Sequence, residues 1–209
     1  MSGEAKPKIV SAAEWEQARD ELLKAEKEAT RTLDAIAARR RRLPMARFGN
    51  YTFTTQDGTT TLLDLFGDQA QLAVYQFMDR GPDEYCPGCT WFTNNVVNLK
   101  GLAQGGVGWA TVSNMPIAQI EAYKAKMGWT LPFVSSRGTS FADDCGAGDA
   151  FGLSMFLRDG PDIYRTYFTT SRGVDRLLFT NNILDLAPYG RQQDWEDSPV
   201  GWPQHPTYG

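Results

Sequence analysis

Apolar residues recur every three or four positions along the first forty residues, a spacing that places them on one face of a helix. Ser11 and Glu14 precede this run in the pattern of a capping box, and Leu43-Pro44 ends it. The sequence therefore predicts a helix from about residue 11 to residue 42. Its apolar face consists of Trp15, Ala18, Leu22, Ala25, Ala29, Leu33 and Ile36.

After Pro44 the pattern changes to short extended runs alternating with helical ones. Residues 71–77 and 107–112 are apolar enough for strands inside a sheet, whereas 51–54 with 59–62, and 153–157 with 163–168, are typical of hairpins. Helices are expected at 90–99, 116–127 and 173–186. This order predicts an α/β fold whose mixed sheet is flanked by helices. We expect three segments: an N-terminal helical extension (1–44), a folded domain (45–190) and an irregular C-terminal tail (191–209).

Composition and charge narrow the class of partner. The net charge is −4, and the basic run Arg39–Arg42 falls where cations favour a helix C-terminus, so no nucleic-acid partner is expected. No apolar stretch approaches the ~20 residues of a membrane span, and the first residues lack the pattern of a signal peptide. These features favour a cytoplasmic protein without a membrane partner. The long helix is a candidate surface for a homodimer.

The segment Glu84–Phe92 (EYCPGCTWF) carries the most informative chemistry. Cys86 and Cys89 are expected where a buried strand gives way to a helix, at the sheet edge where ligands bind in open α/β folds. A helix N-terminus stabilises a thiolate, and the spacing lets the second thiol attack a mixed disulfide formed by the first. Two nearby acids, Asp83 and Glu84, raise a thiol pKa, whereas Arg80 lowers it, so the sequence leaves the net effect open.

Metal binding is an alternative function for the same cysteines. The only soft ligands are Cys86, Cys89, Cys145 and His205, and their spacing matches no zinc motif, so we expect neither a metal nor a cofactor. A thioredoxin-fold protein that binds a metal or ligand without redox catalysis stays an alternative.

Several segments together resemble the family of predicted dithiol–disulfide oxidoreductases, a thioredoxin-like bacterial family. They are RRLPMARFGNYTF, LLDLFGDQAQLAVYQFM, CPGCTWF, AQIEAYKAKMGWTLPFVSS, GLSMFLRDG and LDLAPYGR. The resemblance implies a thioredoxin fold and thiol–disulfide exchange with a small-molecule or protein substrate. By analogy with thioredoxins, Cys86 is the exposed attacking thiolate and Cys89 the resolving thiol. Thioredoxins also place a cis-proline near the position of Phe151-Gly152. Its absence here favours a specialised substrate.

Peroxiredoxins offer an alternative within the same superfamily. Pro82, Cys86 and Cys89 match the spacing of their P-x-x-x-T-x-x-C pattern, with Cys86 in place of the threonine. Cys89 is then the peroxidatic thiol, Cys86 or Cys145 resolves its sulfenic acid, and Arg158 or Arg165 supplies a cation.

The remaining candidates are three substrate-binding residues and the auxiliary residues Cys145, Arg158 and His205. Tyr85, Pro87 and Trp91 flank the cysteines and are expected to line a substrate site. Cys145 is as consistent with a small apolar loop residue as with a redox role. His205, the only histidine, lies in the Pro-rich tail and becomes a proton donor or acceptor only if the tail folds over the cysteines.

Overall fold

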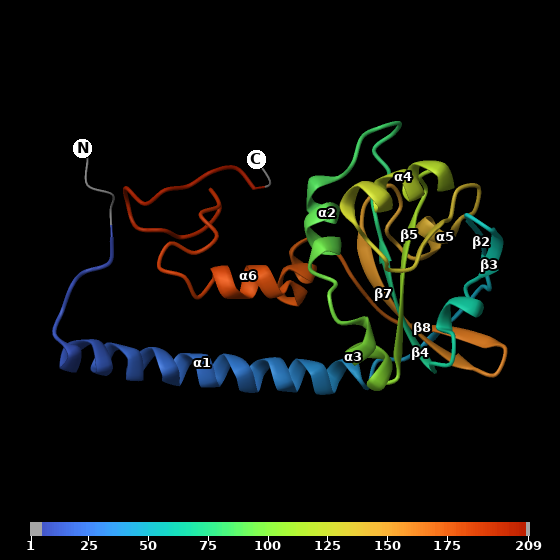
Figure 1. Ribbon diagram of the computed structural model, residues 1–209. Coiled ribbons are helices and arrows are strands. Elements are labelled where there is room, and N and C mark those ends of the chain that lie inside the picture. The colour runs from blue at the N-terminus through green and yellow to red at the C-terminus, as the bar shows by residue number, and fades with distance from the viewer. Residues whose placement is uncertain (1–5, 208–209) are drawn as a thin grey trace. The chain divides into compact units, whose positions relative to one another are not determined.

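A computed structural model describes residues 6–207 and divides the chain into two compact units (Figure 1). One unit combines the N-terminal segment up to Pro44 with Ile183–Thr207, and the other spans Met45–Asn182. The three segments expected from the sequence stay a prediction. No helix within residues 6–207 has both the length and the apolar character needed to cross a membrane.

The predicted N-terminal helix is confirmed as α1, Ala12–Arg40. Its capping box forms as expected: the Glu14 amide donates to Ser11 Oγ at 3.3 Å, and the Glu14 carboxylate accepts from the Ser11 amide at 3.0 Å. None of its residues is buried, and Trp15, Leu22 and Leu33 are each about half exposed. Apart from α1, the described part of this unit contains only the last two residues of one further helix, α6 (Phe179–Leu184).

The second unit is built on an eight-stranded mixed sheet. Its strands are β1 (Ala46–Phe48), β2 (Thr52–Thr55), β3 (Gly58–Thr61), β4 (Gln71–Gln76), β5 (Val107–Ser113), β6 (Phe133–Ser135), β7 (Gly152–Asp159) and β8 (Asp162–Thr169). Their order across the sheet is β1-β8-β7-β4-β5-β6-β2-β3. β4 pairs in parallel with β5 and antiparallel with β7, which in turn pairs antiparallel with β8.

The helices of this unit connect the central strands. α2 (Pro87–Asn94) and α3 (Leu99–Gln104) link β4 to the parallel strand β5, and α4 (Ile117–Met127) links β5 to β6. After the β7–β8 hairpin follow a 3₁₀ helix, η2 (Ser171–Leu177), and α6 (Phe179–Leu184). The strand order β5-β4-β7-β8, with a crossover on one side and a hairpin on the other, is that of a thioredoxin-like fold, as predicted.

Two hydrophobic cores lie on opposite faces of the sheet. Along β4, Ala73 and Tyr75 point to one core, whereas Leu72 and Val74 point to the other, because side chains alternate along a strand. The first core includes the cysteine pair together with residues of α2 and α4. The second is covered by β2, by the 3₁₀ helix η1 (Asp64–Phe66) and by α5 (Phe141–Asp144).

Two predicted helices differ from those observed. The helix expected at 90–99 begins earlier, at Pro87, and stops at Asn94, because Asn98 then caps a new helix by accepting from the Gly101 amide at 2.9 Å. The helix expected at 173–186 is divided into η2 and α6, with Leu178 in an extended conformation between them. The sequence prediction also missed β1 and α5, which are only three and four residues long.

Candidate active site

The cysteine pair lies at the edge of the sheet where β4 ends. After Gln76 the chain forms a loop that an isolated bridge between Asp79 and Tyr85 closes, and Cys86 then becomes the N-cap residue of α2. Pro87 occupies the first turn of the helix, where its missing amide costs no hydrogen bond. The expected strand-to-helix junction is therefore present, and the two cysteines lie there without a disulfide between them.

Cys86 takes the place of the usual serine or aspartate cap. Its Sγ accepts a hydrogen bond from the Cys89 amide at 3.2 Å. The pKa of Cys86 is lowered to about 6, chiefly because the Cys89 thiol donates to its sulfur. The backbone amides of Gly88 and Cys89 and the charge of Arg80 act in the same direction, and burial opposes them. The net effect that the sequence leaves open is therefore a lowered pKa of Cys86, which favours the thiolate.

Cys89 has the opposite electrostatic character. It is 1% exposed, and its Sγ accepts the Met78 amide at 3.5 Å. Cys86 is more exposed than Cys89, but at 7% it is itself buried, so the expectation of an exposed Cys86 is wrong. Its pKa is strongly raised, first because its proton is shared with Cys86 and second because of burial. The pair therefore holds one thiolate at neutral pH, on Cys86, and one proton, on Cys89.

An aromatic network fixes the start of α2. Tyr85 stacks on Tyr123 of α4 with ring centroids 3.5 Å apart and planes 7° from parallel. The Thr90 hydroxyl donates to the Cys86 carbonyl oxygen at 2.9 Å, so its 2.8 Å contact with the Tyr123 hydroxyl is a bond that Tyr123 donates. The sequence analysis missed Tyr123, whose spacing on α4 resembled that of an ordinary core residue.

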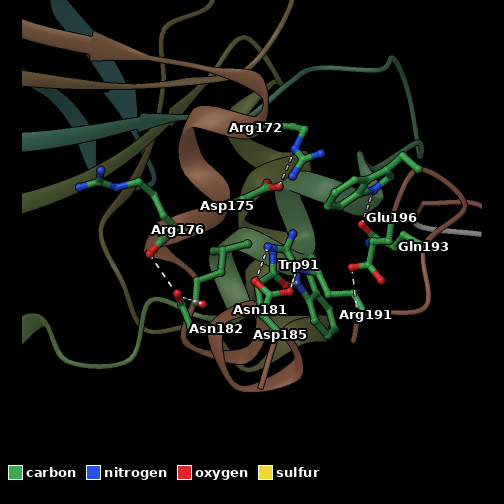
Figure 2. Close-up of polar contacts among 12 residues, drawn as sticks. Trp91, Arg172, Asp175, Arg176, Asn181, Asn182, Asp185, Arg191, Gln193 and Glu196 are labelled. Carbon is green, nitrogen blue, oxygen red and sulfur yellow. Dashed lines mark hydrogen bonds and ion pairs between the residues drawn. The ribbon is translucent and has the colours of Figure 1, made fainter. Parts of the chain in front are cut away.

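The two other residues expected to line a substrate site lie in different surroundings. Pro87 is exposed beside Cys86, where an incoming molecule can reach it. Trp91 is half-buried, and its Nε1 donates to Asn181 Oδ1 at 2.8 Å (Figure 2). This bond ties α2 to α6, so Trp91 contributes to the packing of α2, and its role as a substrate-site wall stays a prediction.

Cys145 lies on the other face of the sheet. It is 2% exposed within the core that includes Phe141 and Phe156, whereas Cys86 and Cys89 belong to the opposite core. Burial raises the pKa of Cys145 to about 12. Because the sheet separates the sulfurs, Cys145 is not placed to resolve an intermediate on Cys86 or Cys89. Of the two readings of the sequence, the structure supports the small buried loop residue.

Neither candidate arginine lies near Cys86 and Cys89. Arg158 follows Leu157, which pairs with Gln71 at the far end of β4, about 17 Å along the strand from Gln76. Its guanidinium lies 5.8 Å from the centroid of the Phe66 ring. Arg165 donates to the Asp144 carbonyl oxygen at 2.7 Å, beside Cys145. The expectation of an auxiliary Arg158 at the cysteines fails because the strand register carries it to the opposite edge.

His205 belongs to the first unit, in the C-terminal tail. Its amide donates to the Gln192 carbonyl oxygen at 2.7 Å, its own carbonyl oxygen accepts from Asp194 at 3.0 Å, and its side chain is exposed. The tail is therefore folded locally around His205, whose part in proton transfer stays a prediction.

The start of β7 also lies at the edge occupied by the cysteines. Gly152 pairs with Gln76, and no peptide bond among residues 6–207 is cis. A Cβ at Gly152 would clash with the Phe168 ring and approach the Thr169 carbonyl oxygen to 3.2 Å. Glycine is thus required here by the close approach of β8.

The acidic and polar side chains near the thiols complete the site. Within the part of the chain that the structure describes, no three or more His, Cys, Asp or Glu side chains gather in a way that could hold a metal ion. The sequence analysis also missed Gln76, a polar residue 4% exposed at the end of the apolar strand β4. The only signal was its presence within the run QLAVYQF.

Comparison with known proteins gives one family match. The model of a family described as bacterial protein of unknown function (DUF899) matches residues 4–208, nearly the whole chain. No curated protein matches the chain.

Solved structures that resemble the chain share little sequence with it. A hypothetical protein from Sinorhizobium meliloti 1021 is 17% identical with a TM-score of 0.48, over 60% of this chain and 69% of that one. A putative protein disulfide isomerase from Bacteroides thetaiotaomicron is 17% identical with a TM-score of 0.47, over 67% and 91%. The bacterioferritin comigratory protein of Xanthomonas campestris is 15% identical with a TM-score of 0.44, over 62% and 88%. At these values the likenesses say nothing of activity, which has to be argued from the chain's own residues.

Proposed function

Given that the chain belongs to the DUF899 family of bacterial proteins, whose description assigns no function, we propose that it is a thiol–disulfide oxidoreductase with Cys86 as the attacking thiolate and Cys89 as the resolving thiol. The observation that carries this proposal is the asymmetry of the pair. Cys86 caps α2 with its pKa lowered to about 6, whereas the buried Cys89 keeps its proton. At neutral pH the pair therefore offers a thiolate that attacks the substrate, Cys86, and a protonated thiol that resolves the mixed disulfide, Cys89.

The reaction proceeds in two balanced exchanges. The Cys86 thiolate attacks one sulfur of a substrate disulfide, its S–S bond breaks, and the other substrate sulfur leaves as a thiolate that takes up a proton from water. Cys89 then loses its proton to solvent or to the departing sulfur and attacks Cys86. The Cys86–Cys89 disulfide forms, the second substrate thiolate leaves, and two electrons have passed from protein to substrate. The reverse sequence oxidises a dithiol.

The peroxidase reading is less favourable. A peroxidatic Cys89 must be a thiolate near neutral pH, but its pKa is raised by sharing its proton with Cys86 and by burial. Arg158 and Arg165 contact residues of the other core, and Cys145 belongs to that core as well. Both arginines expected to supply the cation, and one of the two candidate resolving thiols, therefore lie away from Cys89.

Trapping experiments test the proposal. Cys89→Ser protein should accumulate a mixed disulfide with a small disulfide at Cys86, which mass spectrometry detects, whereas Cys86→Ser protein should not. The reversible couple should have a potential between about −270 and −120 mV, the range of known exchange proteins. Cys145→Ala, from the other core, is the matched control and should retain full exchange.

Two outcomes would reject the assignment. Stoichiometric zinc or iron in freshly purified protein, lost in Cys89→Ser, would favour the metal-binding alternative. Consumption of hydrogen peroxide that depends on Cys89 more than on Cys86 would favour the peroxidase.

A further inference from the structure

A small cavity opens at the sheet edge that carries the cysteines, where β4 and β5 end and β7 begins. Its volume is about 220 Å³. Its polar side chains come from three separate segments: Gln76 and Asp79 at the end of β4, Asn114 after β5, and Asp149 in the loop before β7. On the scale of ~30 Å³ for each liquid water, the space suits a small molecule or the end of a larger one.

Gln76 is the unusual member of this lining. The side chain is 4% exposed, and its amide oxygen Oε1 is buried without a hydrogen-bond partner. The backbone of Gln76 pairs with Val112 of β5 on one side and with Gly152 of β7 on the other. Gln76 therefore lines the cavity with its side chain. A buried acceptor without a donor normally destabilises a fold, and its presence in a cavity wall indicates a donor supplied by a ligand.

The charges around the cavity define that donor. Asp79 and Asp149 are the charged residues of its lining, and both are acids. Asp79 Oδ1 already accepts the Gly81 amide at 2.9 Å, which holds the loop and leaves the second oxygen for a ligand. Two carboxylates and an unpartnered amide oxygen are complementary to a protonated amine, which supplies three N–H donors and one positive charge.

The same loop borders both the cavity and the thiols. Phe77 and Asp79 line the cavity, and the amide of Met78, between them, donates to Cys89 Sγ at 3.5 Å. Phe77 also packs in the core that contains both cysteines. The cavity wall is therefore only one residue along the chain from a backbone contact to the redox pair.

We infer that this cavity binds the protonated amine of a small disulfide substrate and presents the S–S bond to Cys86. This inference rests on the proposed function and names its substrate class: a low-molecular-weight disulfide whose chains end in ammonium groups. The exchange follows the two steps given above, with the ammonium group held while the sulfurs react. Its positive charge next to Asp79 and Asp149 selects it over neutral and anionic disulfides.

The Cys86→Ser/Cys89→Ser double variant lacks both exchanging thiols, so the binding of a disulfide can be measured in it without thiol–disulfide exchange. Cystamine should bind, with chemical-shift changes in the amides of the cavity lining. Two probes with the same number of methylene groups serve as comparisons: bis(2-hydroxyethyl) disulfide, which is neutral, and 3,3′-dithiodipropionate, which is anionic. Both should bind at least about tenfold more weakly, and added salt should weaken cystamine binding most.

Variants assign the effect to the cavity. Asp79→Asn combined with Asp149→Asn should weaken cystamine binding about tenfold, whereas Asp159→Asn, at the hairpin on the far end of β7, should leave it unchanged. Gln76→Met should also weaken binding, while the midpoint of denaturant unfolding stays the same or rises, because an unpartnered polar atom is removed. A lower midpoint would assign Gln76 a purely structural role.

Two different failures can be told apart. Equal binding of all three disulfides to the double variant would overturn the amine site and leave the exchange function intact. Selective cystamine binding together with no mixed disulfide in Cys89→Ser protein would retain the amine site and reject the exchange function.

Discussion

Two buried cysteines on opposite faces of one sheet show how strongly position controls thiol chemistry. Cys86 is 7% exposed and Cys145 is 2% exposed, so burial alone barely separates them. Yet the pKa of Cys86 is lowered to about 6 and that of Cys145 is raised to about 12. The difference lies in the donors: Cys86 receives backbone amides at a helix N-terminus and a thiol from Cys89, whereas burial dominates at Cys145.

The comparison also separates a chemical role from a packing role. α2 begins at the edge of the sheet and turns its free amides toward the Cys86 sulfur, which favours the charged form. Cys145 lies at the end of the four-residue helix α5, among aromatic side chains of the opposite core. The first environment stabilises a nucleophile, and the second suits a small apolar residue.

Alkylation rates should show the difference between Cys86 and Cys145 most clearly. At pH 7 iodoacetamide should modify Cys86 at least about 10²-fold faster than Cys145, even after allowing for the lower intrinsic nucleophilicity of a low-pKa thiolate. The rate at Cys86 should rise with pH and level off above about pH 6, because a lowered pKa keeps the thiolate populated down to that value. Mass spectrometry of peptides from protein quenched at each pH measures both rates. Equal alkylation rates at Cys86 and Cys145 would show that the two thiols do not differ in reactivity.

A smaller effect should follow from removing one donor to Cys86. In Cys89→Ala the thiol hydrogen bond is lost, and the pKa of Cys86 should rise by about one to two units. The alkylation rate at pH 5 should therefore fall about tenfold or more, since less thiolate is present there. Cys89→Ser, which keeps a donor, should change the pKa less. An unchanged profile in the alanine variant would instead assign the lowered pKa to the backbone amides and Arg80.

The smallest effects belong to Cys145. Cys145→Ala should lower the free energy of unfolding by about 1 kcal/mol through lost packing, and Cys145→Ser by about 1–3 kcal/mol, because a hydroxyl is less tolerated in an apolar core. Denaturant unfolding measures both. Exchange activity in the alanine variant should stay within about twofold of the original protein. A large loss of activity without a loss of stability would return Cys145 to the redox site.

Local sequence signals predicted the fold well where the structure depends on neighbouring residues. Ser11 and Glu14 cap α1 as expected, and the apolar run at 71–77 forms the central strand β4. The junction at Cys86 followed from these signals, because a strand, a loop and a helix start are consecutive in the chain. Asn98 was missed as a second cap although the two asparagines and two valines before it are weak helix formers, a signal that marks a break in the helix.

Contacts between distant residues could not be predicted in the same way. The face on which Cys145 lies depends on how α5 packs on the second core, and the position of Arg158 depends on the register of β7 against β4. The cavity requires three segments separated by more than thirty residues each to meet at one edge. Gln76 has no visible role until its backbone partners and its unpartnered oxygen are known.

The sulfur of Cys86 is also the cap of α2, and this double use couples chemistry to helix stability. Formation of a disulfide removes the negative charge that the Cys89 amide and the helix dipole now stabilise. The first turn of α2 should then exchange its amide hydrogens faster in the oxidised protein than in the reduced one. A partner that senses this loosened turn could read the redox state without touching either cysteine.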